Sequence, residues 1–421
     1  MVETRLYIVN IDRRINVMAA DRRFLTARQA ADALGVTTAT LYAYASRGQV
    51  QSEAAPGRTR ERRYYREDIE RLIERKDLRR DPAKVAERGL HWGSPVLASG
   101  ITLIQANALY YRGQNVQALA AAATLEQVAE LLWEAAPEER GRLFDQPCPV
   151  PARDLARLRS QAHDAVTRFQ MALPLAASLD PAAHDLKPAA VRRAGARIMR
   201  LFTAIVSGRQ SPPAAHIALQ DAWAPRSPAV AEAIRSALVL CADHELNVSA
   251  FTARCVASAA ASPYDTVSAA LAALKGSRHG GDSARVVAML AEIGTANRAR
   301  RVVGIRLRLG ERIPGFAHPL YPAGDPRAVT LLQLAESIGH KKEWALIRSV
   351  QAAVADLLQE PPNLDFGLAA VAHAFRLPDA APLVLFAMGR TAGWIAHAIE
   401  QYATETLIRP RARYTGPVPP V

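Results

Sequence analysis

From about Gly93 onward, apolar residues, mostly alanine and leucine, recur at intervals of three and four positions. This spacing places them on one face of an α-helix, whereas the two-residue alternation of a large sheet is not sustained. Proline and glycine divide the pattern into segments of ordinary helix length. We therefore predict a mainly α-helical body. Helical segments are expected at Ala118–Ala136, Ala152–Leu173, Ala189–Val206, Pro228–Leu246 and Ala284–Gly294.

The composition limits the class of protein further. Of 421 residues, 50% are hydrophobic and 22% charged, which is typical of a folded globular chain with room for about three domains of roughly 150 residues. No apolar run reaches the ~18 residues of a membrane-spanning helix, and the charged start lacks the apolar core of a secretion signal. The three cysteines are too few and too widely spaced for a disulfide framework or a zinc finger. We expect a cytoplasmic protein with no metal, no resident cofactor and no membrane partner.

Positive charge is concentrated at the N-terminus. Residues 1–90 contain 19 of the 53 lysines and arginines and 13 of the 40 acidic residues, a net charge of +6, whereas the other 331 residues carry 34 against 27, a net +7. The excess is almost entirely arginine, whose planar guanidinium suits bidentate contact with phosphate. An anionic partner is therefore expected for this end of the chain.

Two short helices are predicted within this basic region. The first covers 25–35 with Thr26 as its N-cap, and the second begins after Thr37 and closes at Arg47–Gly48. Two short helices joined by a tight turn form the helix-turn-helix pattern. A basic β-wing is expected next, ending in Tyr64–Tyr65, and a closing helix follows it.

Residues 24–76 resemble the MerR/excisionase class of winged helix-turn-helix modules. The residues that carry this resemblance are Leu25–Ala31, Leu34–Val36, Thr40–Tyr42 and the wing end Tyr64–Tyr65. In such a module the second helix approaches the major groove and the wing contacts phosphates. The groove residues would be Thr37, Thr38, Thr40, Tyr42 and Tyr44, and the phosphate contacts would be Arg58, Arg60, Arg62 and Arg63. A module of this shape also serves as a protein contact, so DNA is one of two partners that the pattern allows.

Further along, three histidines stand in turn-rich surroundings, within Asp243–Asn247, Lys275–Gly281 and Pro314–Pro319. They lie more than thirty residues apart, and no HxxxH pair occurs, so a metal site is not indicated. Glycines beside a histidine instead let the backbone approach a ligand closely.

These segments belong to an ordered series of motifs, from about Gly93 to Gly416, that resembles the citrate synthase family. The series comprises Leu109–Gly113, Asp243–Asn247, Phe251–Arg254, His279–Gly281, Gly315–His318, Asp325–Arg327, Pro362–Phe366, Gly389–His397 and Ile408–Gly416. The resemblance implies a two-domain helical fold. The expected organisation is a winged helix-turn-helix module over 1–80, a linker over 81–92, a large domain over 93–280 and 383–421, and a small domain over 281–382.

The implied reaction joins acetyl-CoA to oxaloacetate and gives citrate and CoA. It requires a base for the methyl proton, a donor that stabilises the enolate and a donor that polarises the ketone. Asp365 is expected to be the base, because its apolar neighbours raise the pKa of a carboxyl group above about 3.9. His279 is expected to stabilise the enolate, and His318 to polarise the ketone.

Arginines are expected to bind the carboxylates of oxaloacetate as bidentate forks, and the candidates are Arg327, Arg390 and Arg409. His244 would help to orient the same ligand. The resemblance implies that Arg409 acts in the site of a partner subunit, so a homodimer is expected, with Arg411 as a competing candidate. It also implies that oxaloacetate binds first and that the small domain then closes over it.

Departures from the family pattern leave the acyl donor open. Ser277–Arg278 precede His279, Asp282–Ser283 follow its glycines, and Leu357–Glu360 lack the basic residue that the family often has before its P-N-x-D motif. A 2-methylcitrate synthase that uses propionyl-CoA is therefore an alternative. A second alternative is a DNA-binding regulator whose body senses metabolites without turnover, and a third has an active enzyme whose N-terminal module packs a dimer.

Overall fold

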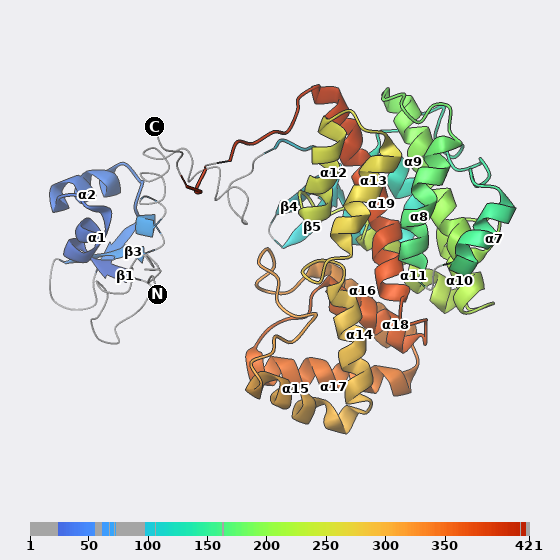
Figure 1. Cartoon of the computed structure of the whole chain (residues 1–421). Coiled ribbons are helices and arrows are strands. Elements are labelled where there is room, and N and C mark those ends of the chain that lie inside the picture. Colours follow the sequence, from blue (N-terminus) through green and yellow to red (C-terminus); the bar gives the residue numbers. More distant parts are fainter. Residues whose placement is uncertain are drawn as a thin grey trace. The chain divides into compact units, whose positions relative to one another are not determined.

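The computed structural model describes residues 24–54, 61–66, 68–70, 72, 97–105, 107–161, 164–412 and 414–417. Contacts divide the chain into two compact units, Met1–Ala98 and Ser99–Val421. Both units appear in Figure 1, where the chain is coloured from blue at its N-terminus to red at its C-terminus.

The first unit contains the two predicted short helices. Helix α1 (Ala27–Leu34) begins with a capping box, in which Thr26 Oγ1 accepts from the backbone N–H of Gln29 and Gln29 Oε1 accepts from that of Thr26. Gly35 ends the helix at a φ of 61°, the left-handed conformation that glycine adopts readily. Helix α2 (Thr38–Ser46) follows at once, and Thr37 Oγ1 caps it by accepting from the Thr40 N–H. The predicted helix-turn-helix is thus confirmed.

A small antiparallel sheet completes this unit, with strand order β1-β3-β2. Its strands are β1 (Phe24–Thr26), β2 (Ser52–Ala54) and β3 (Arg62–Tyr65). Strand β3 lies within the predicted wing, whereas β1 and β2 were not predicted. Arg58 and Arg60 lie outside the described residues. The core of the unit consists of Ala30, Ala31, Leu34, Leu41, Val50, Tyr64 and Ile69.

The second unit is built from helices, with one small sheet near its start. The strands, in the order β4-β5-β6, are Thr102–Gln105, Ala108–Tyr111 and Gln114–Asn115. The helices are α5 (Val116–Ala122), α6 (Leu125–Leu132), α7 (Ala152–Gln161), α8 (Ala165–Ser178), α9 (Pro188–Ser207), α10 (Ala215–Trp223), α11 (Pro228–Leu240), α12 (Val248–Ser258), α13 (Pro263–Leu274), α14 (Asp282–Ile293), the 3-10 turn η1 (Ala296–Arg298), α15 (Ala299–Arg308), α16 (Pro326–Ile338), α17 (Lys341–Leu358), α18 (Leu364–Ala374) and α19 (Ala381–Thr404). The prediction of a mainly α-helical body is confirmed.

Two predicted helices are each divided in the structure. The segment expected at Ala118–Ala136 breaks between α5 and α6, because Thr124 forms a capping box with Gln127 and starts a new helix. The segment expected at Ala152–Leu173 breaks before α8, where Asp164 accepts from the N–H of Thr167. Capping by short polar side chains, and not proline or glycine, causes both breaks.

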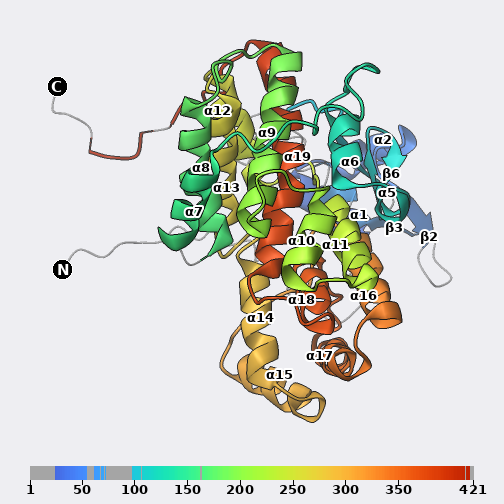
Figure 2. The same cartoon turned by 90° about the vertical axis from the view of Figure 1, so that its right-hand side faces the viewer.

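Helix α19 runs through the middle of the helical layers, as Figures 1 and 2 show. It packs against α6, α9, α11, α12 and α13 and is buried along most of its length. Glycines permit a close approach to the end of α11, since a Cβ on Gly393 would lie 2.4 Å from the Ala242 oxygen and one on Gly389 2.5 Å from the Leu238 oxygen. This approach positions the residue between these glycines, Arg390, beside the loop that follows α11.

Buried side chains of the second unit form two clusters. The larger one is centred on α9, α11, α13 and α19, and the smaller one joins α14, α15 and α17. Helices α16 and α18 contribute to both, for example through Leu331 and Leu368 in the larger cluster and Ala328 and Phe366 in the smaller one. Helices α14, α15 and α17 lie together at one end of the unit (Figures 1 and 2). The predicted domain boundaries stay a prediction.

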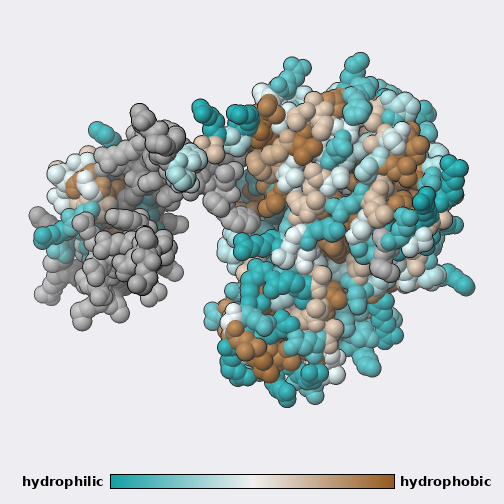
Figure 3. Space-filling model, in the orientation of Figure 1, coloured by the Kyte–Doolittle hydropathy of each residue, from teal (hydrophilic) through white to brown (hydrophobic). Residues whose placement is uncertain are grey.

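None of the described helices is long and apolar enough to cross a membrane. On the face drawn in Figure 3, hydrophilic and hydrophobic residues are interspersed over the second unit.

Candidate active site

Five predicted site residues come from five separate parts of the second unit. His244 follows α11, His279 lies in the turn before α14, and His318 lies in the loop before α16. Asp365 is in the first turn of α18, and Arg390 is in the middle of α19. Hydrogen bonds and ring contacts join these elements around one site, as follows.

His279 is held in a compact turn after α13. A Cβ on Gly281 would lie 2.7 Å from the Lys275 oxygen, so the turn depends on glycine there. His279 Nε2 is 2.8 Å from Ser249 Oγ, and the edge of its ring meets Phe386 with centroids 5.6 Å apart. Burial, followed by the charges of Arg390 and Arg327, lowers the pKa of His279 to about 3. The imidazole is therefore neutral at pH 7.

Ser249 links His279 to α19. Its Oγ accepts a hydrogen bond from Trp394 Nε1 at 3.1 Å and is 2.8 Å from Asn247 Oδ1. An indole N–H can only donate, so Ser249 has one proton left, which it can give either to Asn247 or to His279. The choice sets the tautomer of His279.

His318 follows a strained backbone. Ala317, directly before it, has a φ of 59°, a left-handed conformation that is uncommon for a residue other than glycine. The Leu320 N–H donates to His318 Nδ1 at 3.2 Å. Burial, followed by the charge of Arg327, lowers the pKa of His318 to about 4. The neutral ring therefore carries its hydrogen on Nε2 and presents a donor there.

His244 forms a triangle of rings with His318 and Tyr321. Its centroid is 5.4 Å from that of His318 and 5.6 Å from that of Tyr321, and the latter two are 5.0 Å apart. His244 Nε2 lies 2.9 Å from the Tyr321 hydroxyl. Burial, with the charges of Arg327 and Arg390, lowers the pKa of His244 well below its ordinary value. The rings of His244, His318 and Tyr321 therefore lie together, and two of them come from the loop before α16.

Asp365 is connected to the His279 turn. Asn363 caps α18 by accepting from the N–H groups of Asp365 and Phe366, which fixes the position of the carboxyl group. The Ser283 hydroxyl, four residues after His279, donates to Asp365 Oδ1. Burial raises the pKa of Asp365 to about 7 against the lowering effect of this hydrogen bond. A carboxyl group titrating near neutral pH is suited to proton transfer.

Arg327 is buried and already paired. Its Nε and Nη2 donate to the two carboxylate oxygens of Asp325 at 3.0 and 2.8 Å, and Asp325 also caps α16. The same carboxylate accepts from the Leu364 N–H at 3.2 Å, which ties the Arg327 loop to the start of α18. Asp325 therefore holds Arg327 and the start of α18 in position.

Arg390 is buried and only partly satisfied. Its Nε donates to the Cys241 oxygen at 2.8 Å, but Nη1 and Nη2 are buried and have no hydrogen-bond partner among the described residues. A buried guanidinium with two unsatisfied nitrogens is costly, and a bidentate carboxylate would satisfy both. This is the clearest indication that an anionic ligand belongs in the site.

Arg409 is not brought to the other site residues. It is exposed on the irregular segment after α19, and none of the described residues forms a hydrogen bond or ion pair with it. The Ile408 N–H donates to Ser258 Oγ at 3.0 Å and holds this segment against α12. Its predicted role in a partner subunit stays a prediction.

Three contributors were missed by sequence reasoning, namely Tyr321, Ser249 and Ser283. Each acts through a contact with a residue distant in sequence, on His244, His279 and Asp365 respectively. Only their positions in the sequence could have indicated a role in the site. Ser249 is in the first turn of the helix after the DHELN segment, and Tyr321 lies three residues after His318. His397 lies fully buried, with its Nε2 3.2 Å from Asp243 Oδ1.

The predicted DNA-contacting residues divide into two groups. Thr37, Thr38 and Tyr42 are exposed, and Tyr42 has 54% of its surface accessible. Arg62 and Arg63 instead make contacts within the sheet: Arg62 donates to Ser52. Arg63 pairs with Glu53 and lies over the Phe24 ring at 3.9 Å. Both arginines therefore already have partners within the sheet.

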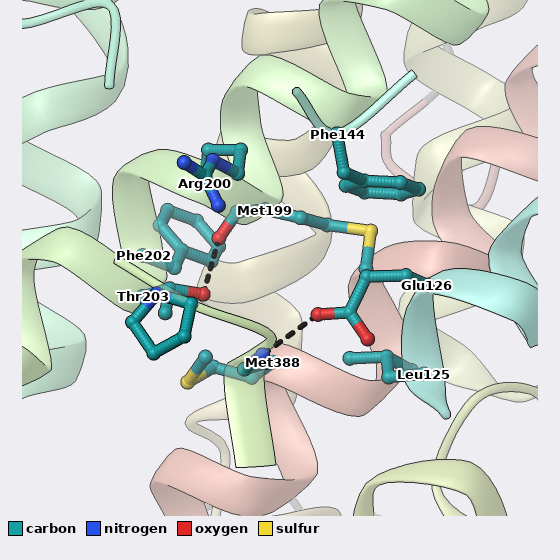
Figure 4. A pocket seen from close by; sticks show the side chains of 10 residues that line it. Leu125, Glu126, Phe144, Met199, Arg200, Phe202, Thr203 and Met388 are labelled. Carbon is teal, nitrogen blue, oxygen red and sulfur yellow. Dashed lines mark hydrogen bonds between the residues drawn. The ribbon is translucent and has the colours of Figure 1, made fainter. Parts of the chain in front are cut away.

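A separate pocket lies between α6, α9, α10 and α19 and contains none of the predicted site residues (Figure 4). Glu126 and Thr203 both lie at its wall (Figure 4). Glu126 Oε1 accepts from the Ala215 N–H at 2.7 Å, and the Thr203 hydroxyl donates to the Met199 oxygen at 2.8 Å. The remaining wall is mostly apolar. This pocket is separate from the histidines and arginines described above.

Comparison with known proteins shows the family to which this chain belongs. A family model described as citrate synthase, C-terminal domain, matches residues 89–411, and one described as a helix-turn-helix domain matches residues 24–77. Citrate synthase 2 of Bacillus subtilis is 32% identical over 359 residues, which cover 79% of this chain and 96% of that protein. A 2-methylcitrate synthase of Mycobacterium tuberculosis is 35% identical over 341 residues, covering 74% of this chain and 86% of that protein.

Solved structures agree as well. The citrate synthase of Thermotoga maritima superposes with a TM-score of 0.66 and 28% identity over 78% of this chain and 96% of that one. A ternary complex of carboxymethyl coenzyme A and oxaloacetate with the citrate synthase of Thermoplasma acidophilum has a TM-score of 0.70, over 80% of this chain and 97% of that one, and at 24% identity supports the fold alone. On the family model and on the relatives together, this chain belongs to the citrate synthase family and carries an N-terminal helix-turn-helix domain.

Proposed function

We propose that this chain condenses an acyl-CoA with oxaloacetate, and that acetyl-CoA is the main donor, giving citrate and CoA. The observation that carries the proposal is the Arg390 guanidinium, buried with two unsatisfied nitrogens and beside two neutral histidines. Asp365, with a pKa of about 7, supplies the base that such a reaction needs. The named citrate and 2-methylcitrate synthase relatives support the same class of reaction.

Oxaloacetate would bind first. Arg390 would take one carboxylate through Nη1 and Nη2, because both are free of protein partners among the described residues. Arg327 would contribute less, since Nε and Nη2 already bind Asp325. His244 and His318 would orient the keto group and the remaining oxygens. Arg409 of the partner subunit would complete the site in a homodimer.

Asp365 would then remove a proton from the methyl group of the thioester. The electron pair moves onto the thioester oxygen, which needs a hydrogen-bond donor as charge develops. His279 can supply it from Nδ1 only if Nε2 accepts, and Ser249 is placed to give Nε2 its proton. Trp394 keeps Ser249 in position for this by donating to the same oxygen.

The enol carbon would attack the ketone carbon of oxaloacetate and form the new carbon–carbon bond. The ketone oxygen becomes an alkoxide that accepts a hydrogen bond from His318 Nε2–H, because His318 Nδ1 already accepts from the Leu320 N–H. The proton that Asp365 removed from the methyl group then neutralises the alkoxide, which leaves Asp365 ionised and His318 neutral. Water then hydrolyses the citryl thioester, so that acetyl-CoA, oxaloacetate and water give citrate and CoA. Both neutral histidines act as hydrogen-bond donors and not as charged acids.

Product identification tests this function. Wild-type protein is mixed with oxaloacetate and either acetyl-CoA or propionyl-CoA, thiol release is followed with a thiol reagent, and the product is identified by mass spectrometry. We expect citrate, with a higher kcat/KM for acetyl-CoA. A higher value for propionyl-CoA would establish a 2-methylcitrate synthase, and no thiol release from either donor would favour the metabolite-sensing regulator.

For the N-terminal module, we propose DNA binding. Support comes from the helix-turn-helix match over residues 24–77 and from the net +6 charge of residues 1–90. Binding to duplex DNA should weaken steeply as salt rises, because phosphate contacts release counterions. A fluorescence anisotropy titration at two salt concentrations measures this, and binding that does not depend on salt would contradict it.

A further inference from the structure

The second helix of the N-terminal module has an unusual surface for a DNA-reading helix. Its nine residues, Thr38–Ser46, contain no charged side chain and no side-chain amide. The pairings that read guanine use arginine or lysine, and those that read adenine use asparagine or glutamine. Helix α2 can therefore make neither of these bidentate contacts.

The hydroxyl groups around α2 are largely used within the helix itself. Thr37 Oγ1 and Thr40 Oγ1 lie 3.0 Å apart and bond to one another, and Thr37 Oγ1 also accepts from the Thr40 N–H. Ser46 Oγ donates to the Ala43 oxygen at 3.0 Å. The hydroxyls of Thr37 and Thr40 are thus occupied, and these two threonines can offer their methyl groups.

The outward side of α2 therefore offers methyl and Cβ groups and one aromatic ring, together with the hydroxyls of Thr38 and Tyr42. Thr38, Ala39 and Ser46 are exposed, and Tyr42 keeps 54% of its surface accessible. Leu41 faces the core and is fully buried. The base-edge group that matches methyl and Cβ surfaces is the 5-methyl group of thymine in the major groove.

Charge near α2 favours DNA over a protein as the occupant of this face. Arg28 on α1 and Arg47 just after α2 are both exposed, and the region as a whole carries net positive charge. Phosphate contacts from such arginines position a module on the duplex without reading its sequence. An apolar helix face beside exposed arginines thus fits a major groove bordered by phosphates.

We propose that α2 reads duplex DNA through thymine methyl groups, so that the module selects sites rich in thymine where the helix lies in the groove. This inference rests on the proposal that the module binds DNA. Sequence preference then comes from apolar contact, while affinity comes from the flanking arginines and depends on salt.

The experiment uses the full chain, checked for condensing activity, to select duplexes from a random library at low salt. Selected sites are then synthesised with deoxyuridine in place of thymidine, which removes only the 5-methyl group. Each replacement under α2 should weaken binding about fourfold, the equivalent of burying one methyl group. The dependence of affinity on salt should not change, because no phosphate contact is lost.

Two variants of one residue separate methyl contact from hydroxyl contact. Thr38→Val keeps a branched apolar side chain and should retain both affinity and the sensitivity to deoxyuridine. Thr38→Ser keeps the hydroxyl and loses the methyl, and should lose both. As a matched control, Arg47→Gln should lower affinity and flatten the salt dependence but leave the sensitivity to deoxyuridine intact.

Three results would overturn the inference. If deoxyuridine duplexes bind as tightly as thymidine duplexes, or if Thr38→Val loses binding while Thr38→Ser keeps it, α2 reads DNA by hydrogen bonds. If an active preparation enriches no sequence and binds no duplex at low salt, DNA binding itself is wrong, and the α2 face is a protein contact.

Discussion

The Ser283 hydroxyl donates a hydrogen bond to Oδ1 of Asp365, from the first turn of α14 to the first turn of α18. The contact joins two segments 82 residues apart. Because Ser283 follows His279 by four residues, the same turn controls both the position of the imidazole and the basicity of the carboxyl group. Several expectations about the reaction depend on this connection.

Replacing Ser283 by alanine should make Asp365 harder to deprotonate. The hydrogen bond from Ser283 lowers the pKa of Asp365, so its loss raises that pKa further above about 7. We expect the acid limb of kcat/KM to move to higher pH by about one unit, the scale of a hydrogen bond to a charged group. Ser283→Thr, which keeps the hydroxyl, is the control, and an unmoved limb in the alanine variant would refute the link.

Asp365 should also make the stability of the protein depend on pH. Its pKa rises from an ordinary 3.8 to about 7 on folding, so folding favours the protonated form. The resulting stabilisation is fully present below about pH 4 and is lost as pH rises through 7. Asp365→Asn, which stays neutral, should therefore raise Tm at pH 8.5 more than at pH 5, measured by calorimetry. An equal change at both values would show that the carboxyl group does not titrate in this range.

Tyr321 should position His244 through its hydrogen bond to Nε2. Burial raises the pKa of Tyr321 to about 12, so its phenol is protonated and can donate to the neutral imidazole, which then carries its hydrogen on Nδ1. In Tyr321→Phe we expect oxaloacetate to bind roughly tenfold more weakly, with a smaller change in kcat. Nitrogen-15 NMR of labelled histidine should report a changed tautomer. Unchanged binding together with an unchanged spectrum would remove Tyr321 from the site.

Arg390 should contribute to ligand binding at the expense of stability. Arg390→Met removes a buried guanidinium with two unsatisfied nitrogens, so Tm should rise while oxaloacetate affinity falls by about 100-fold or more. Arg254→Met provides the contrast, because Arg254 pairs with Glu400 and its loss should lower Tm. Calorimetric melting and titration measure both effects. A lower Tm for Arg390→Met would mean that this guanidinium is satisfied in the free protein.

The sequence predicted the helices well where the apolar periodicity ended at the same place as a proline or glycine that stops a helix. Helix α9 was expected over Ala189–Val206 and extends over Pro188–Ser207. The prediction of helix boundaries was wrong where a polar cap interrupted an otherwise continuous apolar pattern, as at Thr124 and Asp164. Apolar periodicity reports which residues are buried and does not report where a hydrogen-bonded helix ends.

The motifs located the chemically capable residues but not what holds them. His279, His318 and Asp365 could be named from the chain, whereas Ser249 and Tyr321 act only after folding brings them to their partners. The wing gives a further example. The sequence predicted that Arg63 would contact phosphates, but Arg63 forms a salt bridge with Glu53 on the adjacent strand. Cross-strand register is set by the turn, and such pairings cannot be read from composition.

The role of Asp365 as the base of an acyl-CoA condensation can be measured in one paired experiment. Thiol release from acetyl-CoA and oxaloacetate is measured for wild type, for Asp365→Ala and for the surface control Asp221→Asn, with oxaloacetate binding titrated in the same preparations. We predict that Asp365→Ala loses about three orders of magnitude or more in kcat, in line with the removal of a general base. Oxaloacetate binding should be largely kept in that variant, and Asp221→Asn should resemble the wild type. Equal thiol release by wild type and Asp365→Ala would show that Asp365 is not the base.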